Sequence, residues 1–367
     1  GAALARVAVP RAVVAPPAHR RHAGGLVRLV RVLVLLFLGC LLRWHQRDAH
    51  LRTSNFEPAS VTRMLFRMTS RSNSFGAAFL GLRVPEAGGG ANAATMSHMD
   101  STSIAVSLPW PAWLSRADGQ MCLAAALAIA DETSTFGMAA WDAQLRPGVS
   151  VSLSGHRTAA AKIEPGEKIT FASRLIKGGA TLAWIDLKVF RGRDELPLMS
   201  GRHLKFQPSG LPPGWSLLAH PLCRPALYSA MEMAVQNGYS PFERLSTADP
   251  IPLPAEGTSR MDALSIVESC DAEPQTADPL LPGDAVHKTF TASLTRQHGN
   301  PGASLHGGCA AMLLDEVASA GYRSTMAVEA APPVQRMHIN LLGAIPVPRH
   351  AKPPRPVALR TAVSAAE

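Results

Sequence analysis

Apolar and polar residues alternate with a period of two in two separate parts of the chain, and each part also contains one long run of small apolar residues. In the first part, alternation predicts a strand at 103–108, and the following run predicts a helix capped by Asp118 and ending near Phe136. Alternation then returns and predicts strands at 149–154, 168–175, 181–190 and 198–206. This order predicts an α+β unit in which one long helix packs against an antiparallel sheet.

The same order of elements begins again in the C-terminal part. Strands are expected at 286–294 and 334–342 and from residue 356 onward, with a small-residue helix at 306–321. At an offset of 184 residues, Asp131-Glu132 falls on Asp315-Glu316, Gly137 on Gly321 and Ser152 on Arg336. Such a repeat is typical of two fused copies of a module that would otherwise dimerise. The second copy has fewer strands, so we expect it to be incomplete at its C-terminus.

Composition divides the chain into five segments. They are a basic leader (1–72), a linker rich in glycine and small polar residues (73–102), the first repeat (103–207), a Pro-rich connector with one helix expected at 225–237 (208–284), and the second repeat (285–367).

The net charge of +9 originates in the leader. Residues 1–72 hold twelve arginines, no lysine, and only Asp48 and Glu57 as acidic residues, whereas the rest of the chain is close to neutral. The basic balance therefore does not describe the body of the protein, and we expect no nucleic-acid partner.

The leader is rich in arginine and has no acidic residue before Asp48, a composition typical of organelle transit peptides. Its apolar run at 32–42 is shorter than the roughly 20 residues that span a bilayer. We expect a mitochondrial protein, with the plastid and the secretory pathway as alternatives. A retained anchor, with membrane contact through residues 26–42, is the alternative to a cleaved leader.

Five cysteines are scattered without CxxC spacing, which indicates free thiols in a reducing compartment. The histidines outside the motif described next show no metal-ligand spacing, so no metal site is expected.

One segment carries a recognisable motif: Asn300, then His306-Gly307-Gly308, then Asp315 nine residues after the histidine. It resembles the hotdog-fold acyl-CoA thioesterases of the phenylacetate-degradation type, here as a tandem double hotdog. The resemblance implies two antiparallel sheets, each wrapped around a long central helix, and hydrolysis of an acyl-CoA. It implies no metal or redox cofactor, since coenzyme A enters as part of the substrate.

The chemistry of this motif requires a donor and a carboxylate. Gly307 at a helix N-terminus offers an unpaired N–H to a thioester carbonyl, and a carboxylate attacks or activates water. Gly307 and Asp315 would lie about 12 Å apart along one helix, so the carboxylate must come from the other repeat, where Asp131 is expected. By the resemblance, Asn300 would orient the carbonyl or the water, and Ser152 stands at a Ser/Thr position of the family.

The two repeats have lost complementary halves of this site. Repeat 1 has Cys122-Leu123-Ala124 in place of His-Gly-Gly and Arg116 in place of the Asn, and repeat 2 has Arg336 at the Ser/Thr position. One composite site is therefore expected, formed by Asn300, His306, Gly307, Asp131 and Ser152. Its mirror, formed by Asp315, Arg336 and segment 116–124, is expected to be inactive.

Plainer readings remain open. The His-Gly-Gly motif can be a tight loop into a packed helix, Asp131 an ordinary helix-face carboxylate, and Asp315-Glu316 structural. A function of a different class is also open: a catalytically inactive, thioesterase-derived structural subunit of a larger organellar, membrane-associated assembly.

Overall fold

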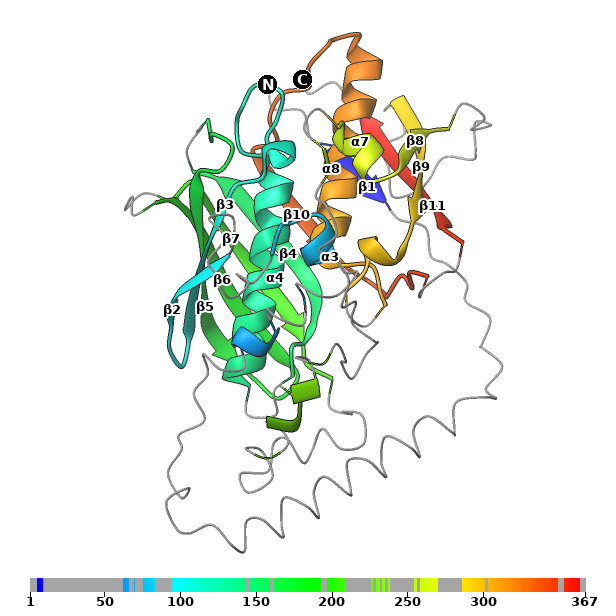
Figure 1. Ribbon diagram of the computed structural model, residues 1–367. Coiled ribbons are helices and arrows are strands. Elements are labelled where there is room, and N and C mark those ends of the chain that lie inside the picture. Colours follow the sequence, from blue (N-terminus) through cyan, green and yellow to red (C-terminus); the bar gives the residue numbers. More distant parts are fainter. Residues whose placement is uncertain are drawn as a thin grey trace, which may run out of the picture.

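The computed structural model describes the body of the chain and parts of its flanking segments (Figure 1). The described residues are 5–8, 62–65, 69, 75–82, 94–142, 146–158, 162–192, 197–208, 226, 229–231, 233–234, 237, 254–255, 258–269, 286–300, 303–348 and 353–363. The apolar run at 32–42 and six of the thirteen residues of the helix expected at 225–237 lie outside them. Within these ranges, no helix combines the length and the apolar character needed to cross a bilayer.

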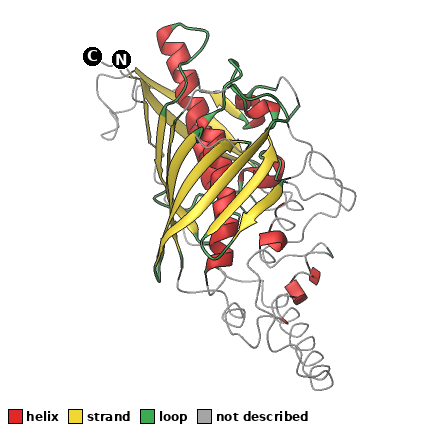
Figure 2. Cartoon of the chain, turned by 90° about the vertical axis from the view of Figure 1, so that its left-hand side faces the viewer, coloured by secondary structure: helices red, strands yellow, loops and turns green. Residues whose placement is uncertain are grey.

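Seven antiparallel strands form the larger sheet, in the order β10-β4-β7-β6-β5-β3-β2 (Figures 1 and 2). Their bounds are β2 Thr95–Met99, β3 Ser103–Pro109, β4 Val149–Arg157, β5 Lys168–Gly178, β6 Leu182–Arg191, β7 Met199–Phe206 and β10 Arg336–Asn340. The five strands predicted from alternation between 103 and 206 are confirmed, with ends shifted by a few residues. β2 was not predicted, because its segment has the composition of a linker.

The long helix α4, Leu123–Trp141, packs on the inner face of this sheet (Figure 1). Odd-numbered residues of β6 and β7 are buried toward it, and even-numbered residues face outward. The expectation that Asp118 caps this helix is wrong. Its carboxylate accepts the Gln120 N–H at 2.9 Å within a turn, and the helix begins five residues later, after Cys122.

A smaller antiparallel sheet has the order β1-β11-β9-β8. Its strands are β1 Ala5–Ala8, β8 Ile266–Glu268, β9 Val286–Leu294 and β11 Arg355–Val363. The second long helix, α8, Gly307–Met326, lies against β9 and β11 (Figure 1). β8 and the short helix α7, Arg260–Ala263, lie in the segment expected to be a connector, and α3, Phe75–Ala78, lies in the expected linker.

The two halves of the chain are joined through a strand and through a helix pair. β10 comes from the C-terminal half but pairs with β4 of the larger sheet, rather than with β9 or β11. α4 and α8 pack side by side, and a Cβ on Gly308 would lie 2.5 Å from the Ala128 Cα. Antiparallel sheets covered by long helices confirm the expected α+β class and fit a hotdog-like fold.

This close approach predicts that Gly308→Ala destabilises the protein. The added methyl group would overlap Ala128 and push the two helices apart, which we expect to cost about 1–3 kcal/mol in the free energy of unfolding. Gly343→Ala is the matched control, because nothing lies within 4 Å of its Cβ position. Chemical denaturation of both variants measures the difference, and equal stabilities would contradict helix contact at Gly308.

Candidate active site

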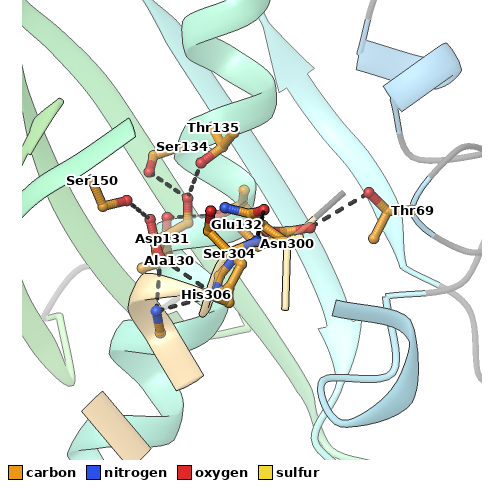
Figure 3. A network of polar contacts seen from close by, with 12 residues as sticks. Thr69, Ala130, Asp131, Glu132, Ser134, Thr135, Ser150, Asn300, Ser304 and His306 are labelled. Atoms are coloured by element: carbon orange, nitrogen blue, oxygen red, sulfur yellow. Dashed lines mark hydrogen bonds and ion pairs between the residues drawn. The ribbon is translucent and has the colours of Figure 1, made fainter. Parts of the chain in front are cut away.

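The middle of α4 meets the first turn of α8, and a carboxylate lies at the junction (Figure 3). The Gly308 N–H donates to Asp131 Oδ2 at 2.8 Å. Gly307 is the first residue of α8, and a Cβ there would lie 2.8 Å from the same oxygen and 3.1 Å from the Ser150 Cβ. Only glycine therefore fits at 307 without displacing the carboxylate. The structure thus brings Asp131 of one half to the helix terminus of the other.

The other oxygen of Asp131 is held from the sheet. Ser150 Oγ on β4 donates to Asp131 Oδ1 at 2.8 Å, His203 Nε2 on β7 lies 3.2 Å away, and Lys205 Nζ lies 3.9 Å away. The Asp131 side chain is 1% exposed. Burial alone would raise its pKa, but His306, His203, Lys205 and the Ser150 hydroxyl together hold the pKa of Asp131 well below its usual range. It is therefore a carboxylate at any ordinary pH.

His203 is fixed in one neutral tautomer by its partners. The Ser150 hydroxyl proton is already given to Asp131, so the Ser150 oxygen can only accept from His203. His203 Nε2, which lies 3.0 Å from that oxygen and 3.2 Å from Asp131 Oδ1, must therefore carry a proton. In the neutral ring His203 Nδ1 is then an acceptor for the Ser134 hydroxyl at 2.8 Å, a hydroxyl that also lies within donating distance, 3.0 Å, of the Asp131 backbone carbonyl. Burial and the nearby Lys205 lower the pKa of His203 to about 3. The imidazole is thus an uncharged donor that orients Asp131.

His306 lies between two carboxylates of α4. Its Nε2 is bonded to Glu132, and its Nδ1 lies 3.5 Å from Asp131 Oδ2. The ring of Phe75 stacks on it, with centroids 5.3 Å apart. Burial lowers the pKa of His306, but Glu132 and Asp131 outweigh burial, and the net shift is upward. The upward shift favours protonation of His306, but its Nδ1 can accept the Gly308 N–H, 3.1 Å away, only while the ring is neutral.

The junction has the donor and the carboxylate that acyl transfer requires. No described residue accepts a hydrogen bond from the Gly307 N–H, which lies at the positive end of α8. A carbonyl oxygen placed there would be polarised, with the Asp131 carboxylate close to its carbon. This arrangement suits nucleophilic attack on an ester or thioester.

Ser152, expected in the site, is not brought to it. Plain alternation puts Ser150, Ser152 and Ser154 on one face, but a bulge between Ser150 and Ser152 breaks the period. Ser150 therefore faces α4 opposite Lys205, while Ser152 points outward and contacts His338 at 3.3 Å. Ser150 takes the place next to Asp131 that had been expected for Ser152.

Asn300 lies beside the cluster but is bonded within its own loop (Figure 3). Its Oδ1 accepts the Ser304 N–H at 3.2 Å, and its backbone N–H donates to the Ser304 carbonyl at 2.8 Å. These bonds close the loop that leads into His306. Asn300 therefore shapes that loop, and among the described residues no hydrogen bond joins it to Asp131.

The mirror half has a different chemistry. Asp315 accepts from the Cys122 thiol at 3.3 Å, and Cys122 precedes the first turn of α4 without capping it. Burial and the Asp315 charge raise the pKa of Cys122 to about 12, so the thiol stays protonated. Glu316 is ion-paired with Arg260. Arg336, expected in this half, lies on the outer sheet face opposite His156.

Four polar residues of the site were not predicted: Glu132, Ser150, His203 and Lys205. The two on β7 occupy odd-numbered positions, whose parity along the strand turns them toward α4. A histidine and a lysine at helix-facing positions are the signal in the sequence that could have found them, since such residues are buried only with partners.

Family models and curated proteins give no match to the chain. Among solved structures, it is similar to zebrafish thioesterase superfamily member 2 (22% identity, 31% of this chain and 81% of that chain, TM-score 0.29). It is similar to mouse thioesterase superfamily member 2 (22% identity, 32% and 82%, TM-score 0.28). A further similarity is to the Escherichia coli PaaI protein of the phenylacetic acid degradation operon (11% identity, 32% and 80%, TM-score 0.28). The assignment of a function therefore depends on the geometry of the cluster.

Buried, neutral His203 predicts a loss of stability in mild acid. Its folded pKa, about 3, lies below the unfolded value of 6.5, so the unfolded chain takes up a proton first as the pH falls. The contribution of neutral His203 to the free energy of unfolding is fully present above pH 6.5 and is lost progressively as the pH falls toward 3. The folding equilibrium should decrease by up to about tenfold per pH unit from this group. His306, whose shift is upward, contributes no such slope below 6.5.

The measurement is chemical denaturation between pH 6 and about pH 4.5 for the wild type and for His203→Asn. The variant should show a shallower dependence on pH, whatever its absolute stability. The control is His156→Gln, which changes an exposed histidine on the outer face and should keep the wild-type slope. Parallel slopes for the wild type and His203→Asn would mean that His203 is not held neutral.

Proposed function

We propose that this protein hydrolyses acyl thioesters, with acyl-CoA as the substrate, at the junction of α4 and α8. The observation that supports this is the Asp131 carboxylate held 2.8 Å from the first-turn Gly308 N–H, next to the Gly307 N–H. The carboxylate and the helix N-terminus lie side by side, and they supply the nucleophile and the oxyanion donor that the reaction requires.

In this proposal the thioester carbonyl oxygen binds at the N-terminus of α8 and displaces Asp131 from the Gly308 N–H. The displacement removes one of the bonds that lower the basicity of Asp131, so substrate binding strengthens the nucleophile. The Asp131 oxygen released from the Gly308 N–H then attacks the carbonyl carbon. The thiolate leaves, and water then hydrolyses the acyl anhydride to free acid.

We further infer that the chain is a tandem double hotdog with one working half. Its support is the reciprocal pair of contacts between the two long helices, Asp131 with Gly308 and Asp315 with Cys122. Only the first contact combines a carboxylate with a glycine amide. In the second, the carboxylate faces a thiol that is protonated because its pKa is about 12.

A second candidate function has its own support in the burial of the cluster. Asp131 is 1% and His306 is 5% exposed, and Phe75 covers the imidazole. A cluster that the protein's own side chains cover in this way suits a catalytically inactive subunit, in which the ion pairs serve only to join α4 to α8. This candidate, in a larger organellar assembly, predicts no turnover of any acyl-CoA.

The test is hydrolysis of short-, medium- and long-chain acyl-CoAs by the purified protein, compared with Asp131→Asn and Asp315→Asn. Asp131→Asn should lower kcat by about 10²–10⁴-fold, because it removes the attacking group while keeping the side-chain volume. Asp315→Asn, at the equivalent position of the mirror half, is the matched control and should keep kcat within a few-fold.

A milder variant guards against misfolding of Asp131→Asn. Ser150→Ala removes one hydroxyl donor and should lower kcat roughly tenfold while the protein remains folded by circular dichroism. Equal losses from Asp131→Asn and Asp315→Asn would contradict the single site. A folded wild type with no turnover on any chain length would favour the structural candidate.

A further inference from the structure

The outer face of the larger sheet, turned away from α4, has an exposed apolar cluster at one end. Its members are between 40% and 52% exposed: Val149, Ile176, Leu182, Trp184 and Phe206. Phe206 is the register partner of both Val149 and Leu182, so three of them form a row across β4, β7 and β6. Trp184 is two residues further along β6, on the same face. Exposed apolar side chains gathered in this way mark an interaction surface.

Basic residues lie directly beside this apolar end. Lys177 is the register partner of Trp184. The next outward row is Arg174, Asp186 and Arg202, in which both arginine side chains are at least 66% exposed and Asp186 lies 3.8 and 3.7 Å from them. Lys188 follows along β6 and is also exposed. Four basic groups thus surround one carboxylate, and the surface is cationic.

The charge decides between two kinds of occupant. A second copy of the chain, face to face, would place four basic groups and one acid against the same set, which is repulsive. An anionic partner is attracted by the same groups. Charge complementarity therefore favours a surface that is both apolar and anionic.

The order of apolar and basic rows along the strands fits a lipid surface. With about 3.3 Å per residue, the arginine row lies about 7 Å from Trp184, and Lys188 about 13 Å. Peripheral proteins bury apolar side chains about 5–10 Å into the headgroup boundary, so the basic rows would lie at headgroup level. The described connections at this end are 100–102, 146–148, 179–181 and 207–208. Their charged residues are Arg146, which is paired with Asp142, and Asp100 in the turn between β2 and β3, whose side chain is 47% exposed.

We propose that this end of the sheet, the apolar cluster with Lys177 and the arginine row, docks on a membrane that contains anionic lipid. Trp184 and its apolar neighbours enter the headgroup boundary, and the basic side chains contact lipid phosphates. The docking surface is separate from the α4–α8 junction, so this proposal does not depend on the proposed hydrolysis.

The test is co-sedimentation of the full chain with phosphatidylcholine vesicles, with and without phosphatidylserine. Trp184→Ser should weaken binding to the anionic vesicles on the order of tenfold, since it removes apolar burial. Val267→Ser, which changes an exposed apolar residue of the smaller sheet, should bind like the wild type. The comparison is between variants because the Arg-rich leader can itself attract anionic vesicles.

Two lysines at opposite ends of β5 provide the second comparison. Lys177→Gln should weaken binding about fivefold. Lys168→Gln, an exposed lysine at the opposite end of β5, should have no effect. The proposal is overturned if the wild type does not prefer anionic vesicles, or if Trp184→Ser binds as well as Val267→Ser. It is also overturned if sedimentation velocity shows a dimer that Trp184→Ser dissolves, because the face would then join copies of the chain.

Discussion

The contact between the Asp131 carboxylate and the first turn of α8 holds the two halves of this protein in place. An anion at a helix N-terminus is favoured by the helix dipole and by the unpaired amides. Here the anion belongs to one helix and the amide to another, so the contact fixes both the spacing and the rotation of α4 against α8. This contact requires small residues where the two helices meet, namely Gly307, Gly308 and Ala128. A larger side chain at any of them would separate the carboxylate from the amide.

Burying this carboxylate requires a set of compensating groups. A lone buried charge costs several kcal/mol, and the cost is offset only when every lone pair has a donor. Ser150 and His203 provide donors from the sheet, and the Lys205 ammonium adds a positive charge 3.9 Å away. His306, the residue before α8, lies 3.5 Å from the same carboxylate. The cluster therefore joins the sheet to both helices, and removing one member takes a partner away from at least one other buried polar group. The same arrangement also fixes the orientation of a nucleophile, so structural and chemical demands coincide here.

The sequence predicted the periodic elements better than the contacts between them. The long strands and both long helices follow from alternation and apolar runs, but β2, β8 and α7 are too short to show a period. The start of α4 was predicted too early, at Asp118, because an aspartate that caps a turn and one that caps a helix look alike in sequence. The bulge in β4 exchanged Ser152 for Ser150, and nothing local in that strand announces it. Asp131 could be placed opposite Gly307 only because helix length excluded Asp315.

The pairing of β10 with β4 has a consequence for how the chain is made. β4 ends at Arg157, and its outer neighbour begins at Arg336, so roughly 180 residues are synthesised before that edge is paired. At about 5–20 residues per second, the edge stays open for about 10–40 seconds. An unpaired strand edge readily accepts a foreign strand. The nascent N-terminal half thus exposes the edge of β4, which β10 covers in the finished protein, and a chaperone that covers strand edges would act in that interval.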